Sequence, residues 1–264
     1  MLTTRTLAAS DFDALHRAFV EAFSDYVVKL SPTREQLAEM FARRGWVPEA
    51  SVAAFDGERM VAFTVNCIDA DSGYDSGTGV VASHRRRGLA RRLMNESCEL
   101  LRARGCTHYV LEVLEANANA YELYRACGFA VARGLQCWTF ASDVAAEVPR
   151  IGDCAQLDDA CDVAPSWQNS NASLARARDA RVVLGDAGAC AIVFPSNGDL
   201  ARLVVRRDAR RRGHGLRLLR AAHAVAGKPL RIMNIDERDR GIAAFLDAAG
   251  ARQLVRQLEL VRVL

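Results

Sequence analysis

Two short turns rich in arginine and glycine are the parts of this sequence best suited to hold an anion. Residues 85–90 read Arg-Arg-Arg-Gly-Leu-Ala and residues 210–215 read Arg-Arg-Arg-Gly-His-Gly, and an amphipathic pattern follows each turn. A helix that starts at such a turn presents unpaired backbone N–H groups and the positive end of its dipole, and glycine lets an anion approach the backbone. Each turn therefore predicts a phosphate site, although a single glycine near a helix start is as often an ordinary turn.

Other phosphate-binding and nucleic-acid-binding patterns do not fit the turns. A Walker loop needs Gly-Lys-Ser or Gly-Lys-Thr, which the chain lacks, and a dinucleotide fingerprint needs a third glycine and an acidic residue about 20 positions later. The arginine runs also lack the interleaved aromatic residues that stack on bases. We therefore expect no nucleoside triphosphate, no nicotinamide cofactor and no nucleic acid.

Three side chains near the first turn are candidates for acid-base chemistry or for contact with a substrate. Tyr124 stands in a helical pattern, and a phenol can serve as a general acid; its alternative role is packing. Glu112 stands among apolar residues of a strand, where a carboxylate is costly unless it has a partner or a task; a solvent-facing structural glutamate is the alternative. Asp75 is a further acidic candidate, or an ordinary loop residue.

Strands and helices that position these residues follow from the apolar pattern. Around the first turn the pattern predicts a hairpin, a helix, a strand, a second helix closed by Gly128 and a final strand pair that ends near residue 140. The expected ranges are 51–56 and 60–68 for the hairpin, 88–105 for the first helix, 108–113 for the strand and 119–127 for the second helix.

The second half of the chain repeats this plan. Gly213 follows Gly88 by 213 − 88 = 125 residues, and Gly250 follows Gly128 by 250 − 128 = 122 residues. Solenoid repeats run from 20 to about 50 residues, so this spacing indicates two copies of one domain. We expect a first domain at residues 1–140, a linker at 141–150 that contains Pro149, and a second domain at 151–264.

Composition is that of an ordinary folded protein of two domains. The chain has 264 residues, of which 50% are hydrophobic and 25% charged, with a net charge of +3. The eight cysteines include no C-x-x-C pair and no cluster with metal-ligand spacing, so we expect reduced core thiols and no metal. The sequence has neither a signal peptide nor a run of about 18 apolar residues, so we expect a cytoplasmic protein that does not enter a membrane.

Taken together, these residues resemble the GCN5-related N-acetyltransferase superfamily, and the whole chain resembles a tandem member of it. The resemblance depends on several motifs in the order that the superfamily has them. These are residues 80–90, Leu111-Glu112-Val113, Asn117, Ala120, Leu123-Tyr124 and Gly128-Phe129.

The resemblance implies an α+β fold, with a mixed, mostly antiparallel, splayed sheet between layers of helices. It also implies acetyl-CoA, or another short acyl-CoA, with its pantetheine arm between the fourth and fifth strands and its pyrophosphate on the first turn. The residues that it assigns to this co-substrate are Val80, Val81, Ala82, Arg85, Arg86, Arg87, Gly88, Leu89, Ala90, Asn117, Ala120 and Tyr124. Ala82 stands where the superfamily often has proline.

Catalytic roles implied by the resemblance belong to the first domain. Tyr124 would protonate the leaving thiolate, which suits its chemistry because a phenol pKa is near 10 and that of a thiol near 8.5. Glu112 has the spacing of the base proposed for ribosomal-protein N-terminal acetyltransferases, with water as the alternative. Asp25 and Tyr26 are expected to line the acceptor site, because the superfamily varies its substrate contacts in the loop after the first helix, where both residues lie. Asp75 is expected to line the same site.

The second domain keeps the turn but loses the tyrosine and asparagine, whose positions fall on Leu246 and Asp239. We expect it to be catalytically silent, either binding CoA or only packing. Residues that would contact CoA there are Val205, Arg210, Arg211, Arg212, Gly213, His214 and Gly215.

From the sequence we therefore expect an N-acetyltransferase that acts on a primary amine by direct attack. The alternative is an acyl-CoA sensor or pseudoenzyme without turnover. The identity of the amine and the oligomeric state stay open, a homodimer included.

Overall fold

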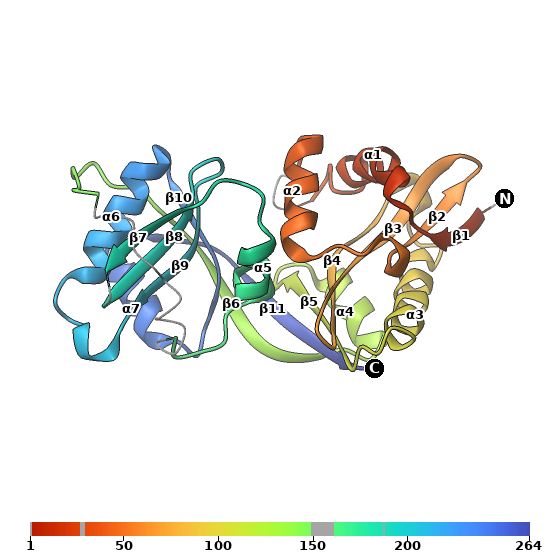
Figure 1. Ribbon diagram of the computed structural model, residues 1–264. Coiled ribbons are helices and arrows are strands. Elements are labelled where there is room, and N and C mark those ends of the chain that lie inside the picture. The colour runs from red at the N-terminus through yellow and green to blue at the C-terminus, as the bar shows by residue number, and fades with distance from the viewer. Residues whose placement is uncertain (1, 27–29, 149–160, 187) are drawn as a thin grey trace. The chain divides into compact units, whose positions relative to one another are not determined.

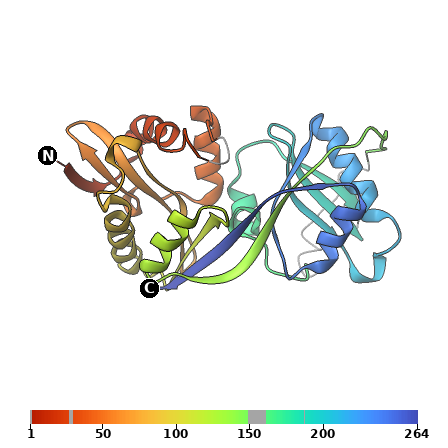
Figure 2. The same cartoon turned by 180° about the vertical axis from the view of Figure 1, so that it is seen from behind.

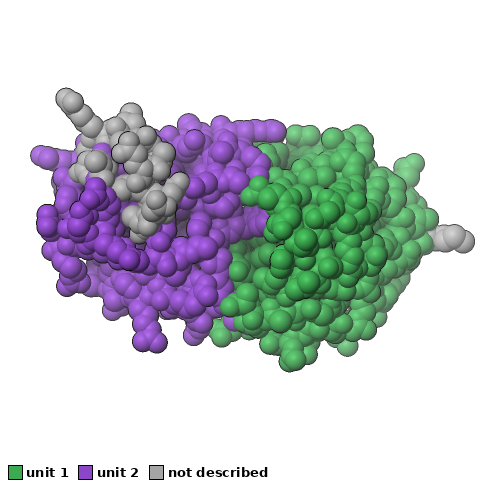
Figure 3. All heavy atoms as spheres, turned by 60° about the horizontal axis from the view of Figure 1, so that its bottom comes forward, with its two compact units in different colours: residues 1–132, 259–264 green, residues 133–258 purple. Residues whose placement is uncertain are grey.

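The computed structural model describes residues 2–26, 30–148, 161–186 and 188–264 (Figure 1). It forms two compact units, which Figure 3 colours separately. Unit 1 contains residues 1–132 and 259–264, and unit 2 contains residues 133–258. Each unit has its own set of strands and its own apolar core.

Unit 1 is built on a mixed sheet whose strands are antiparallel except for the pairing of β4 with β5. The strands follow the order β1 (Leu2–Thr6), β2 (Val52–Asp56), β3 (Arg59–Asp69), β4 (Ser72–Val80) and β5 (His108–Leu114). Beyond β5 lie the last residues of β11 (Arg252–Val263). The mixed, mostly antiparallel sheet expected from the sequence is therefore present.

Helices cover both faces of this sheet, as Figures 1 and 2 show. On one face are α1 (Phe12–Ala22) and α2 (Arg34–Arg44), whose Leu15, Phe19 and Phe41 pack in one cluster with Phe63 of β3. The opposite face carries α3 (Leu89–Arg102), whose apolar side packs on β2 and β3. The remaining helix, α4 (Ala118–Ala126), follows β5 and carries the buried Tyr124.

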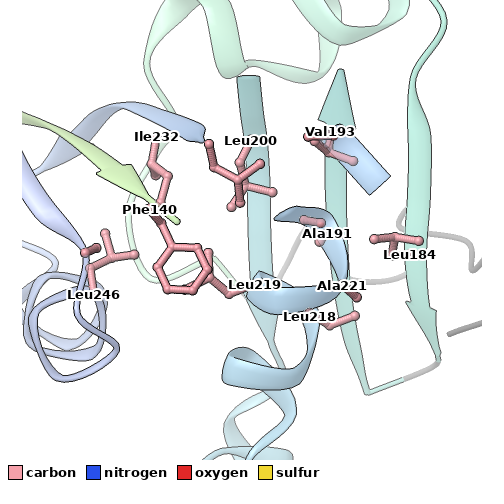
Figure 4. Packing of buried hydrophobic residues seen from close by; sticks show 14 of the residues in the cluster. Phe140, Leu184, Ala191, Val193, Leu200, Leu218, Leu219, Ala221, Ile232 and Leu246 are labelled. Atoms are coloured by element: carbon pink, nitrogen blue, oxygen red, sulfur yellow. The ribbon is translucent and has the colours of Figure 1, made fainter. Parts of the chain in front are cut away.

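Unit 2 repeats the plan with a shorter helical segment at its start. Its strands are β7 (Val182–Asp186), β8 (Ala189–Phe194), β9 (Asp199–Val205) and β10 (Leu230–Asp236), and its helices are α5 (Asn171–Arg176), α6 (His214–Ala226) and α7 (Arg240–Ala248). Leu218 and Leu219 of α6 and Leu246 of α7 pack against the strands in one apolar cluster (Figure 4).

The boundaries of the units differ from those expected from the sequence. Instead of a final strand pair in the first domain, one strand, β6 (Ala130–Phe140), pairs with β10, and its residues from 133 onward belong to unit 2. Trp138 and Phe140 explain this assignment, because both are buried in the unit 2 core. Residues 259–264 belong in turn to unit 1. Of the expected linker, residues 141–148 form no helix or strand, and residues 149–150 lie outside the described residues.

Cysteines and membrane segments complete the comparison with the sequence. In the described part of the chain, six cysteines stand outside any disulfide, but Cys190 is disulfide-bonded, which corrects the expectation of eight reduced thiols. In the described part of the chain, no helix has the length and apolar character needed to cross a membrane. The same residues contain no cluster of His, Cys, Asp and Glu that could hold a metal ion.

Candidate functional site

The first turn presents an open helix start. Arg86 and Gly88 adopt φ angles of 63° and 76°, and the first backbone bond of α3 runs from the Arg92 N–H to the Gly88 carbonyl over 3.0 Å. The N–H groups of residues 89–91 precede this bond and have no helical acceptor. A Cβ placed on Gly88 would meet no atom within 4 Å, so the space beside the turn is open. This is the geometry expected of a phosphate site.

Arg85, the first arginine of the turn, is held by the protein itself. Its Nε donates to the Val80 carbonyl over 3.1 Å, its Nη2 donates to the Ala22 carbonyl over 2.9 Å, and its two Nη atoms donate to the Asp25 carboxylate over 2.6 and 2.8 Å. The hydrogen bond from Arg85 lowers the pKa of Asp25. Arg85 and Asp25, expected to contact co-substrate and acceptor, tie the segment after α1 to the turn.

Strands β4 and β5 part in the middle of unit 1. Their parallel register ends at the pair Asp75 and Leu111, although β4 continues to Val80 and β5 to Leu114. A β-bulge opposite Val65 and Asn66 makes Ser76 an extra residue in β4. Beyond this point no register pair joins the two strands, as the splayed sheet expected from the sequence requires.

Tyr124 lies in a buried polar cluster with β4. Its side chain is only 7% exposed, and burial raises its pKa well above 10, with a further rise from the charge of Asp75. The Asp75 carboxylate is 5% exposed; its Oδ1 accepts from the Gly77 N–H over 2.9 Å and its Oδ2 from the Thr78 hydroxyl over 2.8 Å. Burial raises the pKa of Asp75 to about 6 in spite of these bonds. No pattern in the sequence points to Thr78.

Glu112 has a different neighbour from the one expected. Its Oε2 accepts a hydrogen bond from the Tyr74 hydroxyl over 3.0 Å. Tyr74 and Asp75 are consecutive in β4, so their side chains point to opposite faces of the sheet. Glu112 therefore shares a face with Tyr74 and lies on the other face from Asp75 and Tyr124.

Asn117 caps helix α4 and contacts the segment after α1. Its Oδ1 accepts from the Ala120 N–H over 3.2 Å, and its Nδ2 lies 3.5 Å from the Tyr26 hydroxyl. Tyr26 also contributes to the raised pKa of Tyr124. The structure therefore brings Asn117, Ala120 and Tyr26 to the same end of β5, next to Tyr124.

Val80, Val81 and Ala82 already use main-chain groups inside unit 1. Besides the bond from Arg85 to Val80, the Val81 N–H donates to Val61 over 3.0 Å, and the Ala82 carbonyl accepts from the Arg85 N–H over 3.3 Å. A carbonyl oxygen has two lone pairs, so the Val80 and Ala82 carbonyls can each accept a second hydrogen bond.

The second turn has the same backbone geometry as the first. Arg211 and Gly213 adopt φ angles of 64° and 83°, and the Arg217 N–H donates to the Gly213 carbonyl over 3.1 Å. Arg210 donates to the Val205 carbonyl over 3.0 Å and to Asp162 over 2.6 Å, as Arg85 does to Val80 and Asp25. A cavity of about 320 Å³ lies at this turn, lined by Ala145, Ala146, Glu147, Gly213, Leu216, Arg217 and Arg220.

His214 and Gly215 complete the second turn at the start of α6. The His214 Nδ1 lies 3.3 Å from the Arg217 Nη2. A Cβ on Gly215 would meet the Phe245 ring at 3.3 Å, so Gly215 serves the packing of α6 against α7. The expected CoA contacts of unit 2 therefore stand on a well-formed turn.

The interior of unit 2 is nevertheless apolar where unit 1 is polar. β8 and β9 carry the same bulge, and their register assigns Leu200 to the position of Asp75 and Leu203 to that of Thr78. Leu246 takes the position of Tyr124. Leu200 and Leu246 belong to one apolar cluster, which Figure 4 shows, and the partly buried Leu203 packs against it.

A residue of unit 2, Asn169, also bridges the gap between β9 and β10. The two strands share one register pair, Asp199 with Arg231. Asn169 donates from Nδ2 to the Met233 carbonyl of β10 over 3.0 Å, and its own carbonyl accepts from Arg202 of β9 over 3.3 Å. Asn169 thus occupies the place that is open between β4 and β5.

Comparison with known protein families identifies the family to which unit 1 is related. Residues 12–129, which make up most of unit 1, match the model of the acetyltransferase (GNAT) family. Residues 12–129 belong to the GCN5-related N-acetyltransferase (GNAT) superfamily. This membership confirms the resemblance found in the sequence and supports acyl transfer as the chemistry of the chain. No curated protein matches it.

Solved structures show that the likeness of fold extends to both units. A putative acetyltransferase from Pyrococcus horikoshii is 14% identical, with a TM-score of 0.75 over 100% of this chain and 89% of that one. A GCN5-related N-acetyltransferase from Sphaerobacter thermophilus is 15% identical, with a TM-score of 0.75 over 99% and 95%. A tandem GNAT protein from the clavulanic acid biosynthesis pathway is 16% identical, with a TM-score of 0.64 over 100% and 98%. These likenesses confirm the tandem GNAT fold.

Proposed function

We propose that unit 1 of this GNAT chain transfers an acetyl group, or another short acyl group, from acyl-CoA to a primary amine by direct attack. The observation that carries the proposal is the parting of β4 and β5 beyond Asp75 and Leu111, next to the buried Tyr124. A gap between strand edges suits an extended molecule with amide groups. The proton donor lies at the same place.

The residues around this gap fit an acyl-CoA. Backbone N–H groups of residues 86–90 would hold the pyrophosphate, because α3 makes its first backbone bond at Arg92 and the space beside Gly88 is open. The free strand edges beyond Asp75 would bond the pantetheine amides, with Asn117 at the end of β5. When bound, the acyl-CoA supplies a thioester carbonyl that an amine can attack.

Tyr124 supplies the proton that the leaving group needs. Its raised pKa keeps the hydroxyl protonated at neutral pH, so the O–H bond breaks only as the S–H bond of the thiol forms. The amine proton goes to Glu112 or to water. An α-amine with a pKa near 8 is about one-tenth neutral at pH 7, so such an acceptor needs little help from a base.

Unit 2 is proposed to be catalytically silent and to bind no acyl-CoA. Leu200, Leu203 and Leu246 offer no proton, and Asn169 bridges the strands where pantetheine would enter. Its turn is then a retained structural feature of the GNAT fold.

A screen of thiol release tests the proposed function. The whole chain is incubated with acetyl-CoA and with small amines, antibiotics, peptide N-termini and lysine side chains in turn, and free thiol is measured. We expect release with at least one class. Tight CoA binding without release for any class would contradict the enzyme and identify an acyl-CoA sensor.

Substitution of the turn glycines tests which unit binds the co-substrate. Gly88→Ala adds a methyl group at the mouth of the first turn, and we expect it to raise the KM for acetyl-CoA at least tenfold, about 1.4 kcal/mol of binding. Gly213→Ala is a matched control, because its φ of 83° is similar and its Cβ would also meet nothing within 4 Å. We expect that control to leave KM and the stoichiometry of one acetyl-CoA per chain unchanged. Two sites by titration calorimetry would contradict the proposal for unit 2.

A further inference from the structure

The Asp75 carboxylate forms the centre of a chain of polar groups along β4. Thr78 lies 2.8 Å from the Asp75 Oδ2 and 3.1 Å from the Thr64 hydroxyl. An ionised carboxylate only accepts hydrogen bonds, so Thr78 donates its one proton to Asp75 and accepts from Thr64. The Gly77 N–H donates a hydrogen bond to the other carboxylate oxygen, Oδ1. Asp75 is therefore fixed in one orientation.

Tyr124 lies against this chain of groups. Thr78 and Tyr124 interact through their hydroxyls, and the Tyr124 hydroxyl also acts on the Asp75 carboxylate. The other titratable or charged groups that face Asp75 or Tyr124 are Tyr26 after α1, Arg44 of α2, Tyr109 of β5 and Cys127 at the end of α4. Among the described groups that act most strongly on Tyr124, Asp75 is the carboxylate.

The duplicated unit shows that the fold itself does not require these polar groups. Unit 2 keeps the β-bulge, the left-handed glycine of the turn, the arginine clamp to an aspartate and the side-chain cap of the helix after the parallel strand. It replaces the whole polar set together. Thr64, Asp75, Thr78 and Tyr124 become Ala191, Leu200, Leu203 and Leu246, of which Figure 4 shows Ala191, Leu200 and Leu246 in the apolar core.

The joint replacement indicates that the four polar residues work together. If Asp75 and Thr78 only stabilised the bulge, the same bulge in unit 2 would need a carboxylate and a hydroxyl as well. Leu200 and Leu203 stand there without either. Loss of the tyrosine removes the need for the other three.

We infer that Asp75 and Thr78 are positioning residues that act through Tyr124, holding its hydroxyl ready to protonate the leaving thiolate. This inference rests on the proposed function. The Thr78 hydroxyl limits where the Tyr124 hydroxyl can lie, and the charge of Asp75 disfavours the phenolate, so Tyr124 keeps its proton until the thiolate leaves. When the thiolate leaves, the Tyr124 O–H bond breaks and the S–H bond forms. Water then returns a proton to the phenolate.

The sign of the pH dependence follows from burial. Asp75 titrates near pH 6 in the folded chain and near 3.8 when unfolded. Its burial therefore disfavours the folded state as pH rises from about 4 to about 6, and by the same amount at every higher pH. Asp75→Asn removes this penalty, so the variant is expected to fold.

The test measures the ionisation of Tyr124 directly. Phenolate absorbance is recorded against pH for the whole chain and for Tyr124→Phe, and the difference gives the titration of Tyr124. In an Asp75→Asn background we expect that titration to move down by at least one pH unit. Asp71→Asn is the matched control, because it removes an exposed carboxylate at the start of β4 without touching Tyr124; it should leave the midpoint unchanged.

Kinetics give a second, separate readout. In Asp75→Asn we expect kcat to lose its dependence on pH near 6, with the KM for acetyl-CoA changed less than threefold. Thr78→Val should lower kcat about tenfold, and Thr78→Ser should restore it, because serine keeps the hydroxyl. An unchanged Tyr124 titration in Asp75→Asn, or equal kcat values for the valine and serine variants, would overturn the inference. If the wild-type chain releases no thiol, the proposed function fails, while the titration still tests the contact between Asp75 and Tyr124.

Discussion

Replacing Tyr124 with phenylalanine is expected to lower kcat for thiol release by about 10²-fold or more, because general acid catalysis contributes roughly 10²- to 10⁴-fold. The phenyl ring keeps the packing of Tyr124 against Phe129, whose ring centroid lies 5.9 Å away. Acetyl-CoA affinity should therefore change little. The loss appears in kcat and in kcat/KM to the same extent, which is the mark of an interaction made in the transition state.

Tyr121→Phe is the matched control for this experiment. Tyr121 lies on the same helix, one turn earlier, is less buried than Tyr124 and faces the Arg125 guanidinium. Removing its hydroxyl should change kcat less than twofold. If Tyr124→Phe and Tyr121→Phe both retained the wild-type kcat, the leaving thiolate would take its proton from water. The role assigned to Tyr124 would then be wrong.

Local sequence patterns were sufficient for the parts of the site that lie at the start or end of a helix. The turn at residues 85–90 and the cap at Asn117 depend on a few consecutive residues, whose backbone geometry the sequence largely specifies. The same is true of the second turn. For this reason the repeat could be found from the glycine spacing alone.

The polar cluster around Asp75 depended on pairing between strands and could not be found in that way. A β-bulge shifts which side chains of β4 share a face, and the bulge is defined by the register with β3. The same shift explains why Glu112, close to Tyr124 in sequence, contacts Tyr74 on the other face. A position-by-position alignment of the two copies would have revealed the cluster, since the positions of Asp75 and Thr78 are occupied by leucines in the second copy.

The assignment of the last strand of each repeat was also beyond local pattern. β6 and β11 are both long strands that follow a helix and a glycine, so either could complete the strands of either unit. Only the tertiary packing of their side chains decides which of the two strands completes which unit. Leu260 is fully buried within unit 1, although it belongs to the second repeat.

Removal of residues 259–264 is therefore expected to unfold unit 1, although both turns and every proposed catalytic residue remain in the chain. These residues lie beside β5, where the Leu264 N–H donates to the Thr107 carbonyl over 2.9 Å and Arg262 donates to the Cys127 carbonyl over 2.5 Å. Their loss leaves β5 as an open edge next to the site. Thiol release should fall to background, and circular dichroism should show the loss of folded structure.

A pair of substitutions in the same strand separates this effect from simple shortening of the chain. Leu260 is 0% exposed and Val263 is 74% exposed. Leu260→Ala should lower the free energy of unfolding by about 2–5 kcal/mol, whereas Val263→Ala should change it by less than about 0.5 kcal/mol. Chemical denaturation measures both. A chain that ends at Ala145 lacks residues 259–264 and exposes Trp138 and Phe140, so it should aggregate; stable folding of that fragment would mean that the first repeat completes its own sheet.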